Sequence, residues 1–279
     1  MHAKEEVRIR RVEPSREVVC VLGASGYITS WLVNLLLQHE YSINATVRDP
    51  HQYDLKKIEL IEEGSFDLVV EGCIGVFHTA SLCYFDVKDP QAEMVEPVVK
   101  GTLNILGSYA KVPSIKGVLI TFSIAAVILI GKPLADDVVV DETWFSDPIV
   151  CEKLKILAKK VDWKFVEENG INMVTINPCM VLGPLLRSTL NASVEPIVNL
   201  VGGETFLNAT SRWVNVRDVT NAYILVFETL LACGRYYVAE KSILLKFYPH
   251  LILPQRVKSL GINFTLLEVS LTEKNLLSV

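Results

Sequence analysis

The feature of the sequence that most constrains its fold is a glycine loop between a predicted strand and a predicted helix. The apolar run at 18–22 is typical of a buried strand, and Gly-Ala-Ser-Gly follows it at 23–26. From Tyr27 onward, apolar residues recur at helical spacing. Gly23 permits a tight turn, and Gly26 lets the backbone approach an anion at the helix N-terminus, where N–H groups lack partners. The order strand, loop, helix predicts a phosphate-binding unit, and a tight turn without a ligand is the alternative.

Strands and helices alternate along the first two thirds of the chain. Further strands are predicted at 43–47, 76–80, 118–121 and 173–177, and helices at 97–110 and around 154–165. This alternation predicts an α/β fold with a doubly wound parallel sheet of the Rossmann type. After about residue 185 it weakens, which predicts a small substrate lobe at the carboxyl edge of the sheet. We therefore expect a disordered tail at 1–16, a Rossmann domain at 17–185 and a substrate lobe at 186–279.

Composition excludes several classes of function. The net charge of -5 provides no basic field that would attract nucleic acid or an anionic membrane. The longest apolar run, 118–130, is shorter than the roughly 20 residues that span a bilayer, so we interpret it as a buried strand and its loop. The six cysteines form no CxxC pair, and the five histidines show no metal spacing. We expect a soluble cytoplasmic protein that holds no metal and acts on a small molecule.

The residue after the second predicted strand distinguishes between two nucleotides. Sites for NAD usually place an acidic side chain near this point, where it binds the ribose hydroxyls. Here Arg48 lies 25 residues after Gly23, and a guanidinium suits the 2′-phosphate of NADP. NADP is therefore the predicted cofactor, with a merely solvated arginine at the strand end as the alternative.

Longer motifs resemble one known family. They are Val-Cys-Val-Leu-Gly-Ala-Ser-Gly-Tyr-Ile at 19–28, Ala-Thr-Val-Arg-Asp-Pro at 45–50, Gly-Val-Phe-His-Thr-Ala-Ser at 75–81, Asp-Glu-Thr-Trp-Phe-Ser-Asp-Pro at 141–148, Asn-Pro-Cys-Met-Val-Leu-Gly-Pro at 177–184 and Arg-Trp-Val-Asn-Val-Arg-Asp-Val at 212–219. They resemble the plant cinnamoyl-CoA reductase and dihydroflavonol 4-reductase group of extended short-chain dehydrogenases/reductases. The nearest branch looks like the cinnamyl-alcohol-dehydrogenase or phenylacetaldehyde-reductase type. The resemblance implies an NADP-dependent reductase of phenylpropanoid or flavonoid carbonyls.

The resemblance also implies a set of cofactor contacts. The pyrophosphate would be held by Gly23, Ala24, Ser25, Gly26, Tyr27 and Ile28, and the 2′-phosphate by Arg48. Adenine would lie beside Glu59 and Leu60, and the cofactor path would be lined by Thr79, Ala80 and Ser81. The nicotinamide end would face Pro178, Cys179, Met180, Val181 and Ser193. Small residues at strand ends also serve close packing, so a scaffold role is the alternative for each.

The catalytic set that the family implies is incomplete. The family reduces a carbonyl with a serine, a proton-donating tyrosine and a lysine. Ser123 matches the serine and Lys155 the lysine, but no tyrosine lies on the helix predicted between 151 and 160. The flanks align only if about seven residues, roughly 10 Å of helix, are missing before Lys155.

Two other stretches look compressed relative to the family. Ten residues separate Arg48 from Glu59, where the family has a helix and most of a strand, and the substrate lobe looks truncated between 237 and 258. We therefore predict a reductase with weak or absent activity. A non-catalytic NADP-binding protein and a degenerate gene product are the alternatives. The substrate and the oligomeric state stay open at this point.

Overall fold

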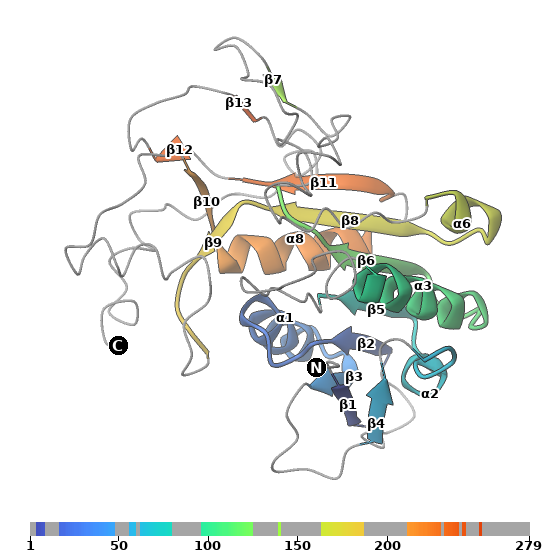
Figure 1. The fold of residues 1–279 in the computed structure, drawn as a ribbon. Coiled ribbons are helices and arrows are strands. Elements are labelled where there is room, and N and C mark those ends of the chain that lie inside the picture. Colours follow the sequence, from blue (N-terminus) through green and yellow to red (C-terminus); the bar gives the residue numbers. More distant parts are fainter. Residues whose placement is uncertain are drawn as a thin grey trace.

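An eight-stranded sheet forms the centre of the fold in the computed structural model, which describes residues 4–8, 17–47, 56–59, 62–79, 96–124, 139–140, 163–186, 211–229, 232–239, 242–243 and 251–252 (Figure 1). Its strand order is β11-β8-β6-β5-β2-β3-β1-β4. The first six strands in this order pair in parallel. They are β11 (Gly234–Val238), β8 (Met173–Pro178), β6 (Gly117–Thr121), β5 (Gly75–His78), β2 (Val18–Leu22) and β3 (Ser42–Val47). The predicted doubly wound parallel sheet is confirmed.

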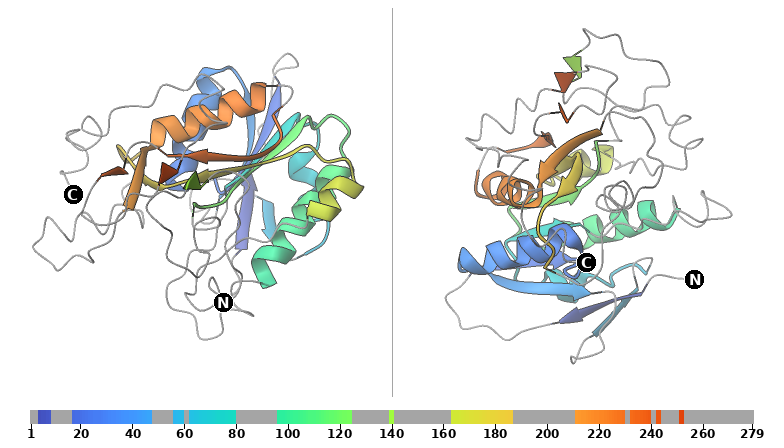
Figure 2. Two further views of the ribbon diagram at one scale, coloured as in Figure 1. Left: turned by 90° about the horizontal axis from the view of Figure 1, so that it is seen from above. Right: turned by 90° about the vertical axis from the view of Figure 1, so that its left-hand side faces the viewer.

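Helices cover both faces of this sheet, which explains why its strands are apolar on both sides. One face carries α1 (Tyr27–Gln38) and α8 (Val216–Glu228); the other carries α2 (Asp67–Val70), α3 (Glu96–Ala110) and α6 (Trp163–Glu168), as Figure 2 shows. Along β2, Val19 and Val21 join the core under α1 and α8, whereas Cys20 and Leu22 join the core under α2 and α3. The side-chain alternation of a strand thus builds two cores from one segment.

The chain returns to the main sheet after residue 185. Strand β10 (Ser211–Asn215) pairs in parallel with β9 (Met180–Leu182), which precedes that point, and α8 and then β11 follow β10, with β11 at the sheet edge. Asn215 caps the N-terminus of α8, because its side chain accepts a hydrogen bond of 2.8 Å from the Arg217 N–H. The main sheet and its helix layer therefore draw on residues from both sides of the boundary expected at 185.

Two small strand pairs complete the described elements. Strand β12 (Ser242–Ile243) pairs with β10, and β13 (Leu251–Ile252) pairs in parallel with β7 (Val139–Val140). In the described part of the chain, no helix is long and apolar enough to cross a membrane. The apolar run that starts at Val118 contributes β6, as the sequence predicted.

The remaining two strands lie at the other edge of the sheet. Strand β1 (Lys4–Arg8) runs antiparallel between β3 and β4 (Lys56–Glu59). Residues 4–8 belong to the segment for which the sequence predicted a disordered tail, and here they form a strand with a neighbour on each side. Nothing in the apolar pattern of residues 4–8 predicts this, because the pairing depends on where β3 and β4 lie in space.

Candidate functional site

The glycine loop lies at the carboxyl end of β2, where its geometry requires glycine at two positions. Gly23 has a φ of 75°, a left-handed conformation that side chains disfavour. The Gly26 N–H donates to the Gly23 carbonyl at 2.9 Å, which closes the turn before α1. A Cβ on Gly26 would lie 2.9 Å from Thr29 Oγ1 and 3.2 Å from the Gly23 carbonyl oxygen. The loop is thus a tight cradle at the N-terminus of a twelve-residue helix, the place where a fold of this type binds a pyrophosphate.

Thr46 on β3 anchors the first half of the loop. The Gly23 N–H donates to Thr46 Oγ1 at 2.9 Å, and the Ala24 N–H donates to the Thr46 carbonyl at 2.8 Å. Thr46 is completely buried. It is a site residue that sequence reasoning missed, because its role depends on the pairing of β3 with β2. The amides of Gly23 and Ala24 are used within the protein, so an incoming phosphate would meet the later part of the loop and the start of α1.

Thr79, which the sequence predicts to line the cofactor path, lies next to the first turn of α1. Its hydroxyl donates to the Leu22 carbonyl at 2.9 Å and lies 2.6 Å from Thr29 Oγ1. Since the Thr79 proton goes to Leu22, the Thr29 hydroxyl donates to Thr79. The network joins the ends of β2 and β5 to the helix that begins the phosphate cradle.

Ser123 lies beyond the carboxyl end of β6 and is exposed. The chain continues there beside β8, because the Phe122 N–H donates to the Ile176 carbonyl at 2.8 Å and the Ile124 N–H to the Pro178 carbonyl at 3.1 Å. The candidate catalytic serine therefore lies level with the start of the segment that was predicted to face nicotinamide.

Tyr223 on α8 forms a hydrogen bond with Thr121, two residues before Ser123. This tyrosine is fully buried, and burial raises its pKa further above the ordinary value of a phenol. It keeps its proton and does not reach solvent. We conclude that Tyr223 supports the end of β6 and does not replace the absent family tyrosine as an acid.

The segment 178–184 is held against α1. The Tyr27 hydroxyl donates to the Gly183 carbonyl at 2.8 Å, and Trp31 Nε1 donates to the Pro184 carbonyl at 2.8 Å. Cys179 N–H donates to the Val238 carbonyl at 3.1 Å. Helix α1 thus connects the predicted pyrophosphate end of the site to the predicted nicotinamide end, and the Tyr27 side chain serves this connection.

Several predicted site residues lie outside the described residues: Arg48, Leu60, Ala80, Ser81, Lys155 and Ser193. Glu59 is the last residue of β4. The described site residues that the structure brings together are the loop 23–28, Thr79, Ser123 and the segment 178–181.

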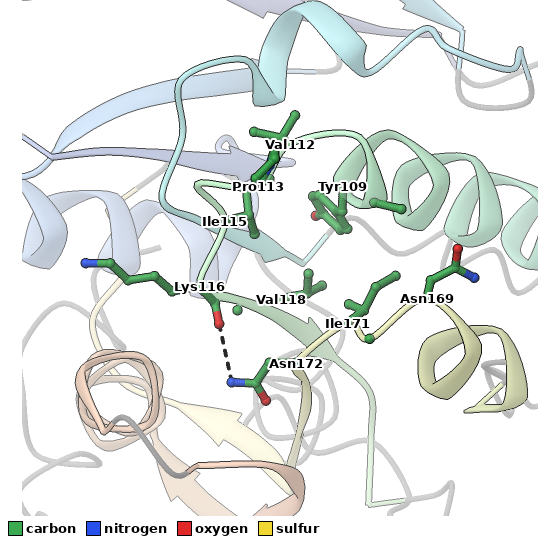
Figure 3. Close-up of a pocket in the computed structure, with 12 residues that line it drawn as sticks. Tyr109, Val112, Pro113, Ile115, Lys116, Val118, Asn169, Ile171 and Asn172 are labelled. Atoms are coloured by element: carbon green, nitrogen blue, oxygen red, sulfur yellow. Dashed lines mark hydrogen bonds between the residues drawn. The ribbon is translucent and has the colours of Figure 1, made fainter.

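A cavity of about 230 Å³ lies elsewhere, at the amino ends of β6 and β8 (Figure 3). It is lined by parts of the segments 109–118 and 169–172, and the Asn172 side chain closes one wall by donating to the Lys116 carbonyl at 3.3 Å. The glycine loop lies at the carboxyl end of β2, and these strands run parallel. The cavity therefore lies at the opposite edge of the sheet from the candidate cofactor site.

The parallel sheet and its glycine loop define a dinucleotide-binding protein of the Rossmann class. The sequence pattern of the NAD dependent epimerase/dehydratase family matches residues 19–239, which is most of the chain. The chain therefore belongs to this family. The expected class, an extended short-chain oxidoreductase with a nicotinamide cofactor, is confirmed.

Named relatives of the chain are plant reductases. It is 50% identical to cinnamoyl-CoA reductase CAD2 of Medicago truncatula, over 92% of this chain and 94% of that protein. It is 37% identical to cinnamoyl-CoA reductase 1 of Petunia hybrida, over 90% of this chain and 89% of that protein. The first alignment extends over 305 positions, more than the 279 residues of this chain, so it contains gaps here. This agrees with the predicted internal gaps.

Solved structures share the fold. Vestitone reductase from alfalfa, Medicago sativa, superposes with a TM-score of 0.74 at 24% identity, over 90% of this chain and 94% of that chain. Gre2 of Candida albicans in complex with NADPH superposes with a TM-score of 0.77 at 25% identity, over 91% of this chain and 96% of that chain.

Proposed function

We propose that this chain binds NADP and reduces the carbonyl group of an aromatic phenylpropanoid or flavonoid compound, at a low rate. The compound would be an aromatic aldehyde, a hydroxycinnamoyl-CoA thioester or a dihydroflavonol. The observation that carries the proposal is the glycine cradle anchored by Thr46, with Ser123 placed at the same edge of the sheet. The named relatives support the substrate class, because cinnamoyl-CoA reductases are prominent among them.

The cradle fits a dinucleotide on two counts. Gly23 adopts a left-handed conformation that favours glycine, and a side chain on Gly26 would collide with Thr29 and the Gly23 carbonyl oxygen. Arg48 follows β3 directly, at the position where a guanidinium would pair with a 2′-phosphate. We therefore expect NADPH to bind more tightly than NADH.

The bound cofactor would supply a hydride to the carbonyl carbon. Ser123 would donate a hydrogen bond to the carbonyl oxygen as that oxygen gains negative charge. Lys155 would hold the nicotinamide ribose, as its match to the family lysine implies. The proton for the oxygen would come from water, since the segment 151–160, which matches the family's catalytic helix, contains no tyrosine. Loss of a general acid typically costs about 10²- to 10⁴-fold in rate, which is the reason for the low rate proposed.

The first experiment titrates the purified protein with NADPH and with NADH and then follows NADPH consumption with cinnamaldehyde, phenylacetaldehyde, cinnamoyl-CoA and dihydroquercetin. Slow, saturable consumption with at least one of them supports the proposal. Replacement Ser123→Ala should lower this rate about a hundredfold and leave NADPH affinity unchanged. A matched control is Ser114→Ala, because the Ser114 hydroxyl donates to the Cys73 carbonyl at 2.8 Å, at the amino end of the sheet.

Binding without catalysis is the second candidate function, and a specific contrast favours it. The glycine loop has the tight geometry of a phosphate cradle, whereas the segment 151–160, which matches the family's catalytic helix, contains no tyrosine. Tight NADPH binding with no consumption of any of the four substrates would support this candidate. Absence of binding would contradict both functions and leave the degenerate gene product. Turnover at the rate of an intact family enzyme would show that another residue supplies the acid.

A further inference from the structure

Strand β1 connects two parts of the main sheet that share no other strand pairing in the described residues. It pairs with β3 through residues 6–8 and with β4 through residues 4–7. In the strand order, β4 follows β1 and has no other neighbour. The position of β4 in the sheet therefore depends on β1, and Figure 1 shows the three strands side by side.

The register places this connection at the edge of the sheet where the cofactor would bind. Val7 pairs with Thr46, the residue that holds the Gly23 and Ala24 amides, and Glu6 pairs with Val47, the last residue of β3. Because β1 runs antiparallel to β3, its amino end lies beyond the carboxyl end of β3. There Lys4 pairs with Glu59, the residue expected beside adenine.

From this arrangement we propose that β1 is a positioning segment for the adenosine half of NADP. It closes the edge of β3 beside the Thr46 anchor and holds β4 so that Glu59 reaches the same edge. The inference rests on the proposed function, since it concerns the same cofactor site. It assigns a role in cofactor binding to residues 4–8, which the family motifs do not cover.

The physical basis is preorganisation of the site. Without β1, β3 would present an open edge and β4 would have no strand to pair with. The adenosine half would then bind the fraction of molecules in which β4 is in place, and its apparent affinity would fall by that fraction. The affinity for the nicotinamide half would not change, because the segment 178–184 is held by hydrogen bonds from Tyr27 and Trp31 on α1.

The test is the substitution Val7→Pro in the full chain. Proline has no N–H, and β1 has a neighbour on both sides, so the substitution removes a sheet hydrogen bond at whichever strand the N–H faces. The matched control is Val12→Pro, which introduces the same residue four positions after Arg8, the last residue of β1. The readouts are calorimetric dissociation constants for 2′,5′-ADP, NADPH and reduced nicotinamide mononucleotide, together with the thermal midpoint of unfolding.

We expect Val7→Pro to weaken 2′,5′-ADP and NADPH binding about tenfold, as if one molecule in ten kept β4 in place. Binding of the mononucleotide and all constants of Val12→Pro should match the parent. A second variant lacks residues 1–9, and a synthetic peptide of that sequence should restore its 2′,5′-ADP affinity.

Unchanged 2′,5′-ADP binding in both variants would overturn the inference and leave the proposed function standing. Equal weakening of 2′,5′-ADP and the mononucleotide would also overturn it, because β1 would then act on the whole fold. A parent protein that binds neither NADPH nor 2′,5′-ADP would refute the proposed function, and the inference with it.

Discussion

Replacement of Gly26 by alanine tests whether the glycine loop is an anion cradle. The new Cβ would lie 2.9 Å from Thr29 Oγ1 and 3.2 Å from the Gly23 carbonyl oxygen. Thr29 cannot swing away freely, because its hydroxyl is buried and bonded to Thr79 Oγ1 at 2.6 Å. The Gly23 oxygen is backbone and already accepts the Gly26 N–H. The loop must therefore open, and the start of α1 must move.

The magnitude follows from these contacts. Overpacking of a tight turn should lower the free energy of unfolding by about 1–3 kcal/mol. A displaced helix N-terminus should lose about one hydrogen bond to a charged phosphate, worth roughly 1.5–3 kcal/mol. That loss corresponds to a dissociation constant for NADPH raised roughly 10- to 150-fold.

The assay is NADPH titration by calorimetry, with thermal unfolding measured on the same samples. Gly107→Ala is the matched control, because Gly107 lies within α3 and a Cβ there would meet nothing within 4 Å. In a helix the added methyl should stabilise the protein by about 0.5–1 kcal/mol and leave the dissociation constant unchanged. Parent-like affinity in Gly26→Ala would refute the cradle. An equal loss of affinity in both variants would show that the effect is not local.

Three further predictions concern the Thr46 anchor, the packing of α8 on the sheet and the buried Tyr223. Thr46→Val keeps the shape of the side chain but leaves the Gly23 N–H without its acceptor. The free energy of unfolding measured in urea should therefore fall by about 1–3 kcal/mol. A variant more stable than the parent would contradict the anchor role. Gly75→Ala would place a Cβ 2.1 Å from the ring of Phe227, which packs on Phe77 with 5.1 Å between the ring centroids. We expect the free energy of unfolding in urea to fall by about 3 kcal/mol. An unfolding midpoint equal to that of the parent would contradict this packing. The raised pKa of Tyr223 stabilises the folded state below the ordinary phenol pKa of about 10, and this contribution is lost as the pH rises toward the folded pKa. Tyr223→Phe should therefore flatten the alkaline fall in unfolding free energy by up to about 1.4 kcal/mol per pH unit, and an identical slope in both proteins would exclude this role.

The parallel core was predictable because local patterns report burial. The run 18–22, the helical spacing after Tyr27 and the apolar segment 173–177 each match an element of the structure, β2, α1 and β8. A strand buried on both faces must be apolar throughout, and a helix on a sheet must be apolar on one stripe. Both rules can be applied to a few consecutive residues without knowledge of the rest of the chain.

Parts of the candidate site were less accessible to such reasoning. Ser123 was found from a resemblance, and its position beside β8 depends on bonds to Ile176 and Pro178. Thr46 was missed, because a buried threonine on a strand has the same local pattern whether or not it anchors a loop. Tyr27 was assigned to the pyrophosphate, and only the structure shows that its hydroxyl also donates to the Gly183 carbonyl, 156 positions away in the sequence.

The sequence by itself determined the class of fold, the family and the loop that fits a pyrophosphate. Each depends on short segments whose residue types have a direct physical meaning. Tertiary structure alone decided that β11 returns to the main sheet, that Thr46 supports the loop and that residues 4–8 fill the place between β3 and β4. These are contacts between segments distant in sequence. Every residue except proline carries the same backbone N–H and C=O groups, so the residue types of a segment hardly indicate which strand it will pair with.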